Sequence, residues 1–167
     1  MSRLYLLRHA KAGWALPGVR DFDRPLDATG IADAEATGKT MRAWAYVPEL
    51  TLCSNAKRAR ETLEGIAANA DTGRVVFTDD LYSSDAAGYL DKVRDNGQHG
   101  SILLIGHNPM MEDLAMAVSG SGEEGALHTL HTGFPTSGLA VIRFQTSLSE
   151  AQLGQGYLES FLTPADL

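Results

Sequence analysis

The sequence predicts an α/β fold with three layers, α/β/α, around a mixed central sheet whose strands are mostly parallel. First, short apolar runs typical of buried strands alternate with longer segments whose apolar residues recur every three or four positions. Such alternation produces parallel strands joined by crossover helices. Second, two apolar runs near the C-terminus have no helical segment between them, which predicts that the sheet is mixed.

The composition of the 167 residues fits one globular domain, with 44% hydrophobic and 21% charged residues. The net charge of −7 argues against nucleic acid or an anionic membrane as a partner. There is neither a signal-peptide pattern nor a run of about 18 apolar residues, so we expect a cytoplasmic protein without a membrane span. We further expect a monomer. The single cysteine, Cys53, excludes an internal disulfide and lies in an apolar run typical of a core.

The N-terminal part of the chain predicts a strand, a loop and a helix. Residues 3–7 are an apolar run that indicates a buried strand. Glycines, prolines and charges over residues 11–29 indicate a loop. From about residue 30 to 46, apolar or small residues recur at alternating spacings of three and four, which predicts one helix face ended by Pro48.

The middle of the chain predicts two strands and two helices. Residues 49–53 form a short strand, after which Ser54 is expected to cap a helix that extends to about residue 70. The β-branched and aromatic residues of 74–78 indicate another strand. Residues 79–85 are predicted to form a polar loop, and residues 86–94 a helix.

The C-terminal part begins with a buried strand over residues 101–105. Pro109 suits the first position of a helix that extends to about residue 118. Residues 119–136 show no clear periodicity, and this length predicts a lid or binding loop. Residues 137–145 indicate a strand, and residues 157–162 a possible last strand.

Three of the predicted strands end in turns that carry cations and imidazoles. Arg8 and His9 follow the first strand, Arg58 lies in the first turn of the helix after the second, and His107 and Asn108 follow the strand at 101–105. The carboxyl ends of parallel strands meet at one edge of a sheet, where ligands bind. Arginine side chains and helix N-termini both favour phosphate. The sequence therefore predicts a phosphate site with histidine nucleophiles beside it.

Each of these residues also has a purely structural interpretation. The pair after the first strand could simply solvate the strand end, and His107 could cap a helix or lie satisfied in the core. Cations at a helix start oppose the helix dipole. We expect Lys57 and Arg60 to be solvated and paired with nearby glutamates, whereas the convergence of strand ends favours a functional role for Arg58.

The residues of all three turns resemble the motifs of the histidine phosphatase superfamily, whose fold is phosphoglycerate mutase-like. Residues 6–10 (Leu-Leu-Arg-His-Ala) resemble its Arg-His-Gly signature. Residues 54–62 (Ser-x-x-x-Arg-Ala-x-x-Thr) and 106–109 (Gly-His-Asn-Pro) are similar to its second and third motifs. Ala10 replaces the usual glycine, and Asn55 a common proline. The resemblance covers nearly all of residues 1–167 and implies a single histidine phosphatase domain.

Two further segments resemble the SixA branch, the protein phosphohistidine phosphatases. They are residues 24–30 (Arg-Pro-Leu-x-x-x-Gly) and 134–136 (Phe-Pro-Thr). The resemblance implies that His9 becomes phosphorylated, that Arg8 and Arg58 bind the phosphoryl oxygens, and that His107 stabilises the transferring group.

Two weaker candidates complete the predicted substrate site. Asn108 belongs to the third motif, and Arg24 could either enter the pocket or pair with Asp21 or Asp23. The substrate is expected to be a phosphorylated protein or a small phosphorylated molecule.

No metal or cofactor is expected, because the arginines supply the positive charge that phosphoryl transfer needs. His128 and His131 are three residues apart but have no obvious carboxylate or cysteine partner, so we expect them to belong to loop structure.

A proton donor for the leaving group is harder to identify. Many superfamily members carry an acidic residue after the third strand, where Asp80 and Asp85 are only weak candidates. Phosphohistidine, with its good leaving group, suits such a site best. The alternatives are a small-molecule phosphomonoesterase, a phosphoglycerate-type mutase and a non-enzymatic phosphate-binding module.

Overall fold

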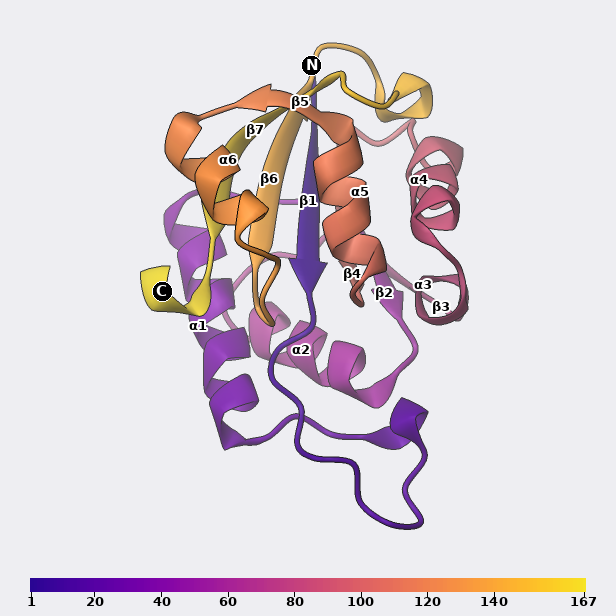
Figure 1. Ribbon diagram of the computed structural model, residues 1–167, viewed down its shortest axis with the longest axis vertical. Helices are drawn as coiled ribbons and strands as arrows, with labels where there is room; N and C mark the ends of the chain where they lie inside the picture. Colours follow the sequence, from indigo (N-terminus) through magenta and orange to yellow (C-terminus); the bar gives the residue numbers. More distant parts are fainter.

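A computed structural model describes residues 1–167 and places seven strands in one sheet, in the order β3-β2-β4-β1-β6-β7-β5 (Figure 1). Neighbouring strands are parallel except where β6 pairs with β1 and with β7, so only β6 runs against the others. The mixed, mostly parallel sheet is confirmed. The strands are β1 (Ser2–Arg8), β2 (Leu50–Ser54), β3 (Arg74–Thr78), β4 (Ser101–Gly106), β5 (Ser119–Gly122), β6 (Leu139–Phe144) and β7 (Gly156–Leu162).

Helices cover both faces of the sheet, which confirms the three layers (Figure 1). Leu4 and Leu6 of β1 face the larger core with α4, α5 and α6, whereas Tyr5 and Leu7 face the smaller core with α1 and α2. Because both faces are covered, β1 is apolar without interruption. The helices are α1 (Ala28–Ala43), α2 (Lys57–Ala67), α3 (Asp80–Ser83), α4 (Ala86–Asp95), α5 (Met110–Val118) and α6 (Glu124–His131).

The prediction of a lid or binding loop over residues 119–136 is wrong, because β5 and α6 lie within this segment. A Cβ at Gly120 would lie 1.9 Å from the carbonyl oxygen of Gly154, and one at Gly122 would lie 2.7 Å from Leu158. The strand therefore needs glycines to approach β7, and glycines hide the usual strand pattern. The helix α6 is short and packs Leu130 into the core.

Two smaller predictions also fail. The polar segment 79–85 contains the one-turn helix α3, whose Leu81 is fully buried. Ser54 ends β2 instead of capping the next helix, since the cap residue of α2 is Ala56. The Ser54 hydroxyl is taken by another partner, described below.

Remaining differences are shifts of a few residues at element ends. The helix α1 begins at Ala28, because the Asp27 carboxylate accepts a hydrogen bond from the Gly30 N–H at 2.8 Å. Pro109 caps α5 and Met110 is its first residue. None of the helices combines the length and apolar character that a bilayer span requires.

Candidate active site

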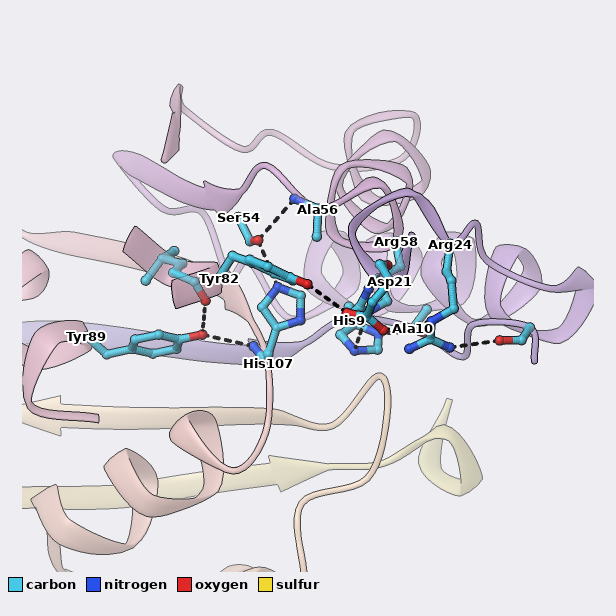
Figure 2. Close-up of polar contacts among 12 residues, drawn as sticks. His9, Ala10, Asp21, Arg24, Ser54, Ala56, Arg58, Tyr82, Tyr89 and His107 are labelled. Carbon is cyan, nitrogen blue, oxygen red and sulfur yellow. Dashed lines mark hydrogen bonds and ion pairs between the residues drawn. The ribbon is translucent and has the colours of Figure 1, made fainter. Parts of the chain in front are cut away.

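The carboxyl ends of β1, β4 and β2 lie side by side and bring the predicted site residues together. Arg8 is in register with Gly106, and the His9 N–H donates to the Gly106 carbonyl at 3.0 Å. The rings of His9 and His107 have centroids 5.2 Å apart. From α2, the Arg58 Nε–H donates to His9 Nε2 at 3.3 Å (Figure 2). The structure therefore brings His9, His107 and Arg58 together at one edge of the sheet.

One hydrogen bond sets the tautomer of the buried His9 ring. Its Nδ1 lies 2.7 Å from the carbonyl oxygen of Ala10, which can only accept, so the proton is on Nδ1. The Ala10 N–H is held in turn by the Thr62 hydroxyl at 2.9 Å, and that hydroxyl donates to the Arg58 carbonyl at 2.7 Å. Nε2 therefore keeps its lone pair and accepts from Arg58, which is the arrangement of a nucleophile.

Both imidazoles are neutral at ordinary pH. Burial lowers the pKa of His9 to about 3, with further lowering by His107, Arg58 and Arg8, although the bond to Ala10 acts the other way. Burial, followed by the charge of Arg58, lowers the pKa of His107 to about 4. A neutral ring is required for attack on phosphorus, because a protonated nitrogen has no free electron pair.

His107 is held from two sides. Its Nε2 lies 2.8 Å from the Ser54 hydroxyl, which also accepts the Ala56 N–H at 3.2 Å. Its backbone N–H donates to the Tyr89 hydroxyl at 3.1 Å, and Tyr89 donates to the carbonyl of Leu81. A Ser54 proton directed at Nε2 leaves a proton on Nδ1, which is buried without a partner in the protein.

Arg8 leaves a second buried donor without a partner. Its Nη1 donates to the carbonyl of Phe134 at 3.0 Å, whereas its Nε has no acceptor in the protein. Buried polar groups are nearly always paired. The unpaired nitrogens of Arg8 and His107 lie at the ends of the neighbouring strands β1 and β4, and an oxyanion bound there could satisfy them.

Arg58 is paired with a residue that the sequence analysis did not place in the site. Its Nη1 donates to the Asp21 carbonyl at 2.8 Å and its Nη2 to the Asp21 carboxylate at 3.1 Å. The Tyr82 hydroxyl donates to the same carboxylate at 2.9 Å, and the Tyr82 ring meets His107 edge-on at 5.4 Å (Figure 2). The only sequence signal for either residue was the density of charges around Asp21.

Arg24 and Asn108 reach the cluster through other residues. Arg24 donates to the Asp21 carboxylate at 2.9 Å and to the Gly13 carbonyl at 2.9 Å, so one of its two predicted alternatives, pairing with Asp21, is present. The Asn108 amide donates to the Phe134 carbonyl at 2.9 Å, and its oxygen accepts the N–H of Glu112 at 3.2 Å.

The two candidate acids have structural partners. Asp80 forms an ion pair with Lys92 at 2.6 Å, and Asp85 caps α4 by accepting the Gly88 N–H at 2.8 Å. Tyr82 is the residue of this segment that lies against His107. No carboxylate from residues 79–85 therefore contacts the histidines.

The remaining residues discussed from the sequence lie outside the histidine cluster. Cys53 is fully buried, and burial raises the pKa of its thiol to about 12, so it is a core residue. Arg60 packs over the ring of Phe77 at 4.7 Å instead of pairing with a glutamate. The structure holds no group of three or more His, Cys, Asp or Glu side chains suited to a metal ion. The expectation that His128 and His131 belong to loop structure is wrong, because both lie in α6.

A cavity of about 420 Å³ opens beside Arg8 on the side of α5 and α6. Polar residues dominate its wall, among them Asn108, Glu112 and Thr132. It has room for a part of a substrate next to the strand ends.

The comparisons with known proteins agree with this geometry. The profile of the histidine phosphatase superfamily (branch 1) matches residues 4–87. An uncharacterised protein of Mycobacterium tuberculosis is 31% identical over 161 residues, which are 95% of this chain and 99% of that protein.

Solved structures share the whole fold. A candidate phosphohistidine phosphatase SixA from Agrobacterium tumefaciens has a TM-score of 0.83 and 39% identity, with 98% of this chain and 99% of that chain covered. The protein histidine phosphatase SixA in complex with tungstate has a TM-score of 0.77 at 20% identity, with 98% of each chain covered. The second match shows a common fold.

Proposed function

This chain belongs to branch 1 of the histidine phosphatase superfamily and is of the SixA type, and we propose that it hydrolyses phosphohistidine in proteins. The observation that carries the proposal is the state of His9. Its ring is buried, neutral and held with Nε2 toward Arg58, in a cluster with unpaired donors on Arg8 and His107.

In the first step, Nε2 of His9 attacks the phosphorus of the substrate. The bond to phosphorus forms as the bond to the leaving nitrogen breaks, and the phosphoryl group moves to His9. The Ala10 carbonyl stabilises the Nδ1–H as positive charge develops on the ring. Arg8, Arg58 and the Nδ1–H of His107 bind the phosphoryl oxygens, which carry the charge of the transition state.

In the second step, water attacks the phosphorus of phosphorylated His9. The electron pair of the P–N bond returns to Nε2, and inorganic phosphate leaves. The same three donors hold the oxygens in both steps, so the site does not have to rearrange between them. His9 is restored to its starting state, and the enzyme can begin another catalytic cycle.

The leaving group decides the substrate class. Alkoxides are poor leaving groups, and general acid catalysis typically contributes about 10²–10⁴-fold to their departure. Asp80 and Asp85 are engaged elsewhere, so the segment that carries an acid in many superfamily members offers none to the histidines. Imidazole leaves without an enzyme acid when its second nitrogen already carries a proton. This difference supports phosphohistidine over sugar phosphates.

A small phosphomonoester is the second candidate substrate. The polar cavity beside Arg8 supports it, because it could hold the body of a small molecule next to the phosphoryl site. The alkoxide of such a substrate would have to leave without a proton donor, because neither Asp80 nor Asp85 contacts the histidines.

Hydrolysis rates on a matched panel test the proposal. The panel contains a phosphohistidine peptide, an aryl phosphate and a sugar phosphate, each assayed for kcat/KM with release of phosphate as the readout. We expect the phosphohistidine peptide to be fastest, the aryl phosphate intermediate and the sugar phosphate slowest. A sugar phosphate hydrolysed as fast as the peptide would contradict the proposal.

A further inference from the structure

We propose that Asp21 is a specificity-determining residue, whose carboxylate accepts the N–H of a protonated imidazole leaving group once the phosphoryl group has taken its place on Arg58. This inference rests on the proposed function and extends it. It assigns the preference for P–N over P–O bonds to one side chain in the loop between β1 and α1.

The hydrogen bonds of Arg58 are the first argument. Nε donates to His9 Nε2, Nη1 to the Asp21 carbonyl and Nη2 to the Asp21 carboxylate. A phosphoryl group attacked by His9 must bind donors of this same guanidinium. The carboxylate is the anionic partner of Arg58, so a phosphoryl dianion replaces it on Nη2. Only the Arg58 guanidinium then separates the displaced oxygen of Asp21 from the attacking nitrogen of His9.

Two other groups keep the carboxylate there after the exchange. Arg24 donates to one oxygen at 2.9 Å, and the Tyr82 hydroxyl donates to the other at 2.9 Å (Figure 2). The Asp21 side chain is 53% exposed, whereas that of Arg58 is 7% exposed. Asp21 therefore lies on the solvent side of the cluster, from which the substrate and its leaving group must come.

The Asp21 carboxylate can accept a hydrogen bond but cannot donate a proton near neutral pH. Partial burial favours its protonated form, but hydrogen bonds and charge from Tyr82, Arg58 and Arg24 outweigh this and lower its pKa to about 2. An ionised carboxylate has only acceptors. It suits a cationic leaving group and repels a leaving oxygen on which negative charge develops.

The chemistry of phosphohistidine matches such an acceptor. The reactive form carries a proton on the ring nitrogen that is not bonded to phosphorus. When His9 attacks, the P–N bond breaks, its electron pair returns to the leaving ring, and the ring departs as neutral imidazole with that proton. A carboxylate that accepts this N–H stabilises the protonated form before transfer. Aryl and sugar phosphates present no such N–H.

The test compares Asp21→Asn with Asp23→Asn, whose carboxylate pairs with Arg20 at 2.8 Å on the exposed side of the same turn. For each variant, kcat/KM is measured with a phosphohistidine peptide and with an aryl phosphate. We expect Asp21→Asn to lower the ratio of the two values by at least about tenfold. Asp23→Asn should leave the ratio unchanged. Equal losses on both substrates would show that Asp21 only holds Arg58, and would overturn the inference.

A pH profile adds a second readout. The charged and titratable groups that face Asp21 are Arg24 of its own loop, Arg58 of α2, Tyr82 of α3 and His107 after β4. With phosphohistidine, kcat should fall on the alkaline side as the ring of the bound substrate loses its proton.

Without the carboxylate, this alkaline limb should move to lower pH, because the protonated ring is less stabilised. The aryl phosphate should show no such shift, and an unmoved limb in Asp21→Asn would overturn the inference. A wild-type chain without activity on phosphohistidine would instead refute the proposed function, and this inference with it.

Discussion

At the scale of single residues, His9 shows how burial prepares a nucleophile. A histidine in water is partly protonated near pH 6.5. Burial lowers the pKa of His9 to about 3, and the Ala10 carbonyl keeps the remaining proton on Nδ1. The two effects leave Nε2 unprotonated over the whole physiological range, as an acceptor for the Nε–H of Arg58. The charges of Arg8 and Arg58 act in the same direction as burial.

The role of Arg58 can be tested against its neighbour Lys57. Loss of a charge-assisted hydrogen bond typically costs about 1.5–3 kcal/mol, so Arg58→Ala should lower kcat/KM at least about tenfold. Lys57 is exposed and has no ion pair, so Lys57→Ala should change kcat/KM little. Steady-state kinetics with an aryl phosphate provide the measurement. Equal losses at the two positions would refute the assignment of Arg58 to the phosphoryl site.

The candidate site residues that lie together in the structure share one property. Arg8 ends β1, His9 and His107 directly follow β1 and β4, and Arg58 lies in the first turn of the helix after β2. The parallel topology alone brings these strand ends together. Asp21 and Tyr82 lie in polar segments without periodicity. Only tertiary packing brings those segments together, so no local sequence pattern predicts that they meet at the site.

At the scale of elements, close packing between β1 and α1 positions the nucleophile. The N–H of Ala10 is held by α2, and the next residue, Lys11, crosses the first turn of α1. A Cβ on Gly30 would lie 2.0 Å from the Lys11 carbonyl oxygen. Gly30 is therefore required for steric reasons, because the segment that follows His9 passes too close for a side chain at this position.

Gly30→Ala should therefore destabilise the fold, whereas Gly125→Ala should not. Overpacking against backbone typically costs about 1–3 kcal/mol. Gly125 also lies in the first turn of a helix, α6, but its Cβ would meet nothing within 4 Å. Chemical denaturation of both variants gives the free energies of unfolding. A Gly30 variant as stable as the Gly125 variant would contradict the packing argument.

Elements were predicted well where both faces are buried and poorly where packing needs small residues. The apolar runs of β1, β2 and β4 left no alternative to buried strands. In β5 (Ser119–Gly122), Gly120 lies too close to Gly154, and Gly122 too close to Leu158 of β7, for a side chain at either position. Such a strand is stabilised by its neighbours, and its own sequence does not indicate it.

At the scale of the whole molecule, the two neutral histidines link the site to the stability of the fold. The pKa values of His9 and His107 are about 3 and about 4 in the folded protein, against about 6.5 in an unfolded chain. Between these values the unfolded chain binds more protons than the folded one. The free energy of unfolding must then fall as the pH falls below about 6.5.

We expect a histidine that stays neutral in the fold to lower the free energy of unfolding by up to about 2 kcal/mol between pH 7 and pH 5. His9→Asn should therefore lose less stability over this interval than the wild type. His131→Asn, at an exposed position of α6, should behave as the wild type does. Urea unfolding at both pH values measures the difference. An identical pH dependence in the His9 variant would contradict a neutral, buried His9.

The most direct test of the account is to trap the phosphorylated enzyme. The control residue is His99, which precedes β4 and lies 3.6 Å from the Glu49 carboxylate. The wild type, His9→Ala and His99→Ala are mixed with a ³²P-labelled phosphohistidine peptide and quenched in alkali, where phosphohistidine survives. We expect acid-labile label on His9 in the wild type and in the His99 variant, and neither label nor turnover in His9→Ala. Label on another residue, or turnover that survives in His9→Ala, would contradict it.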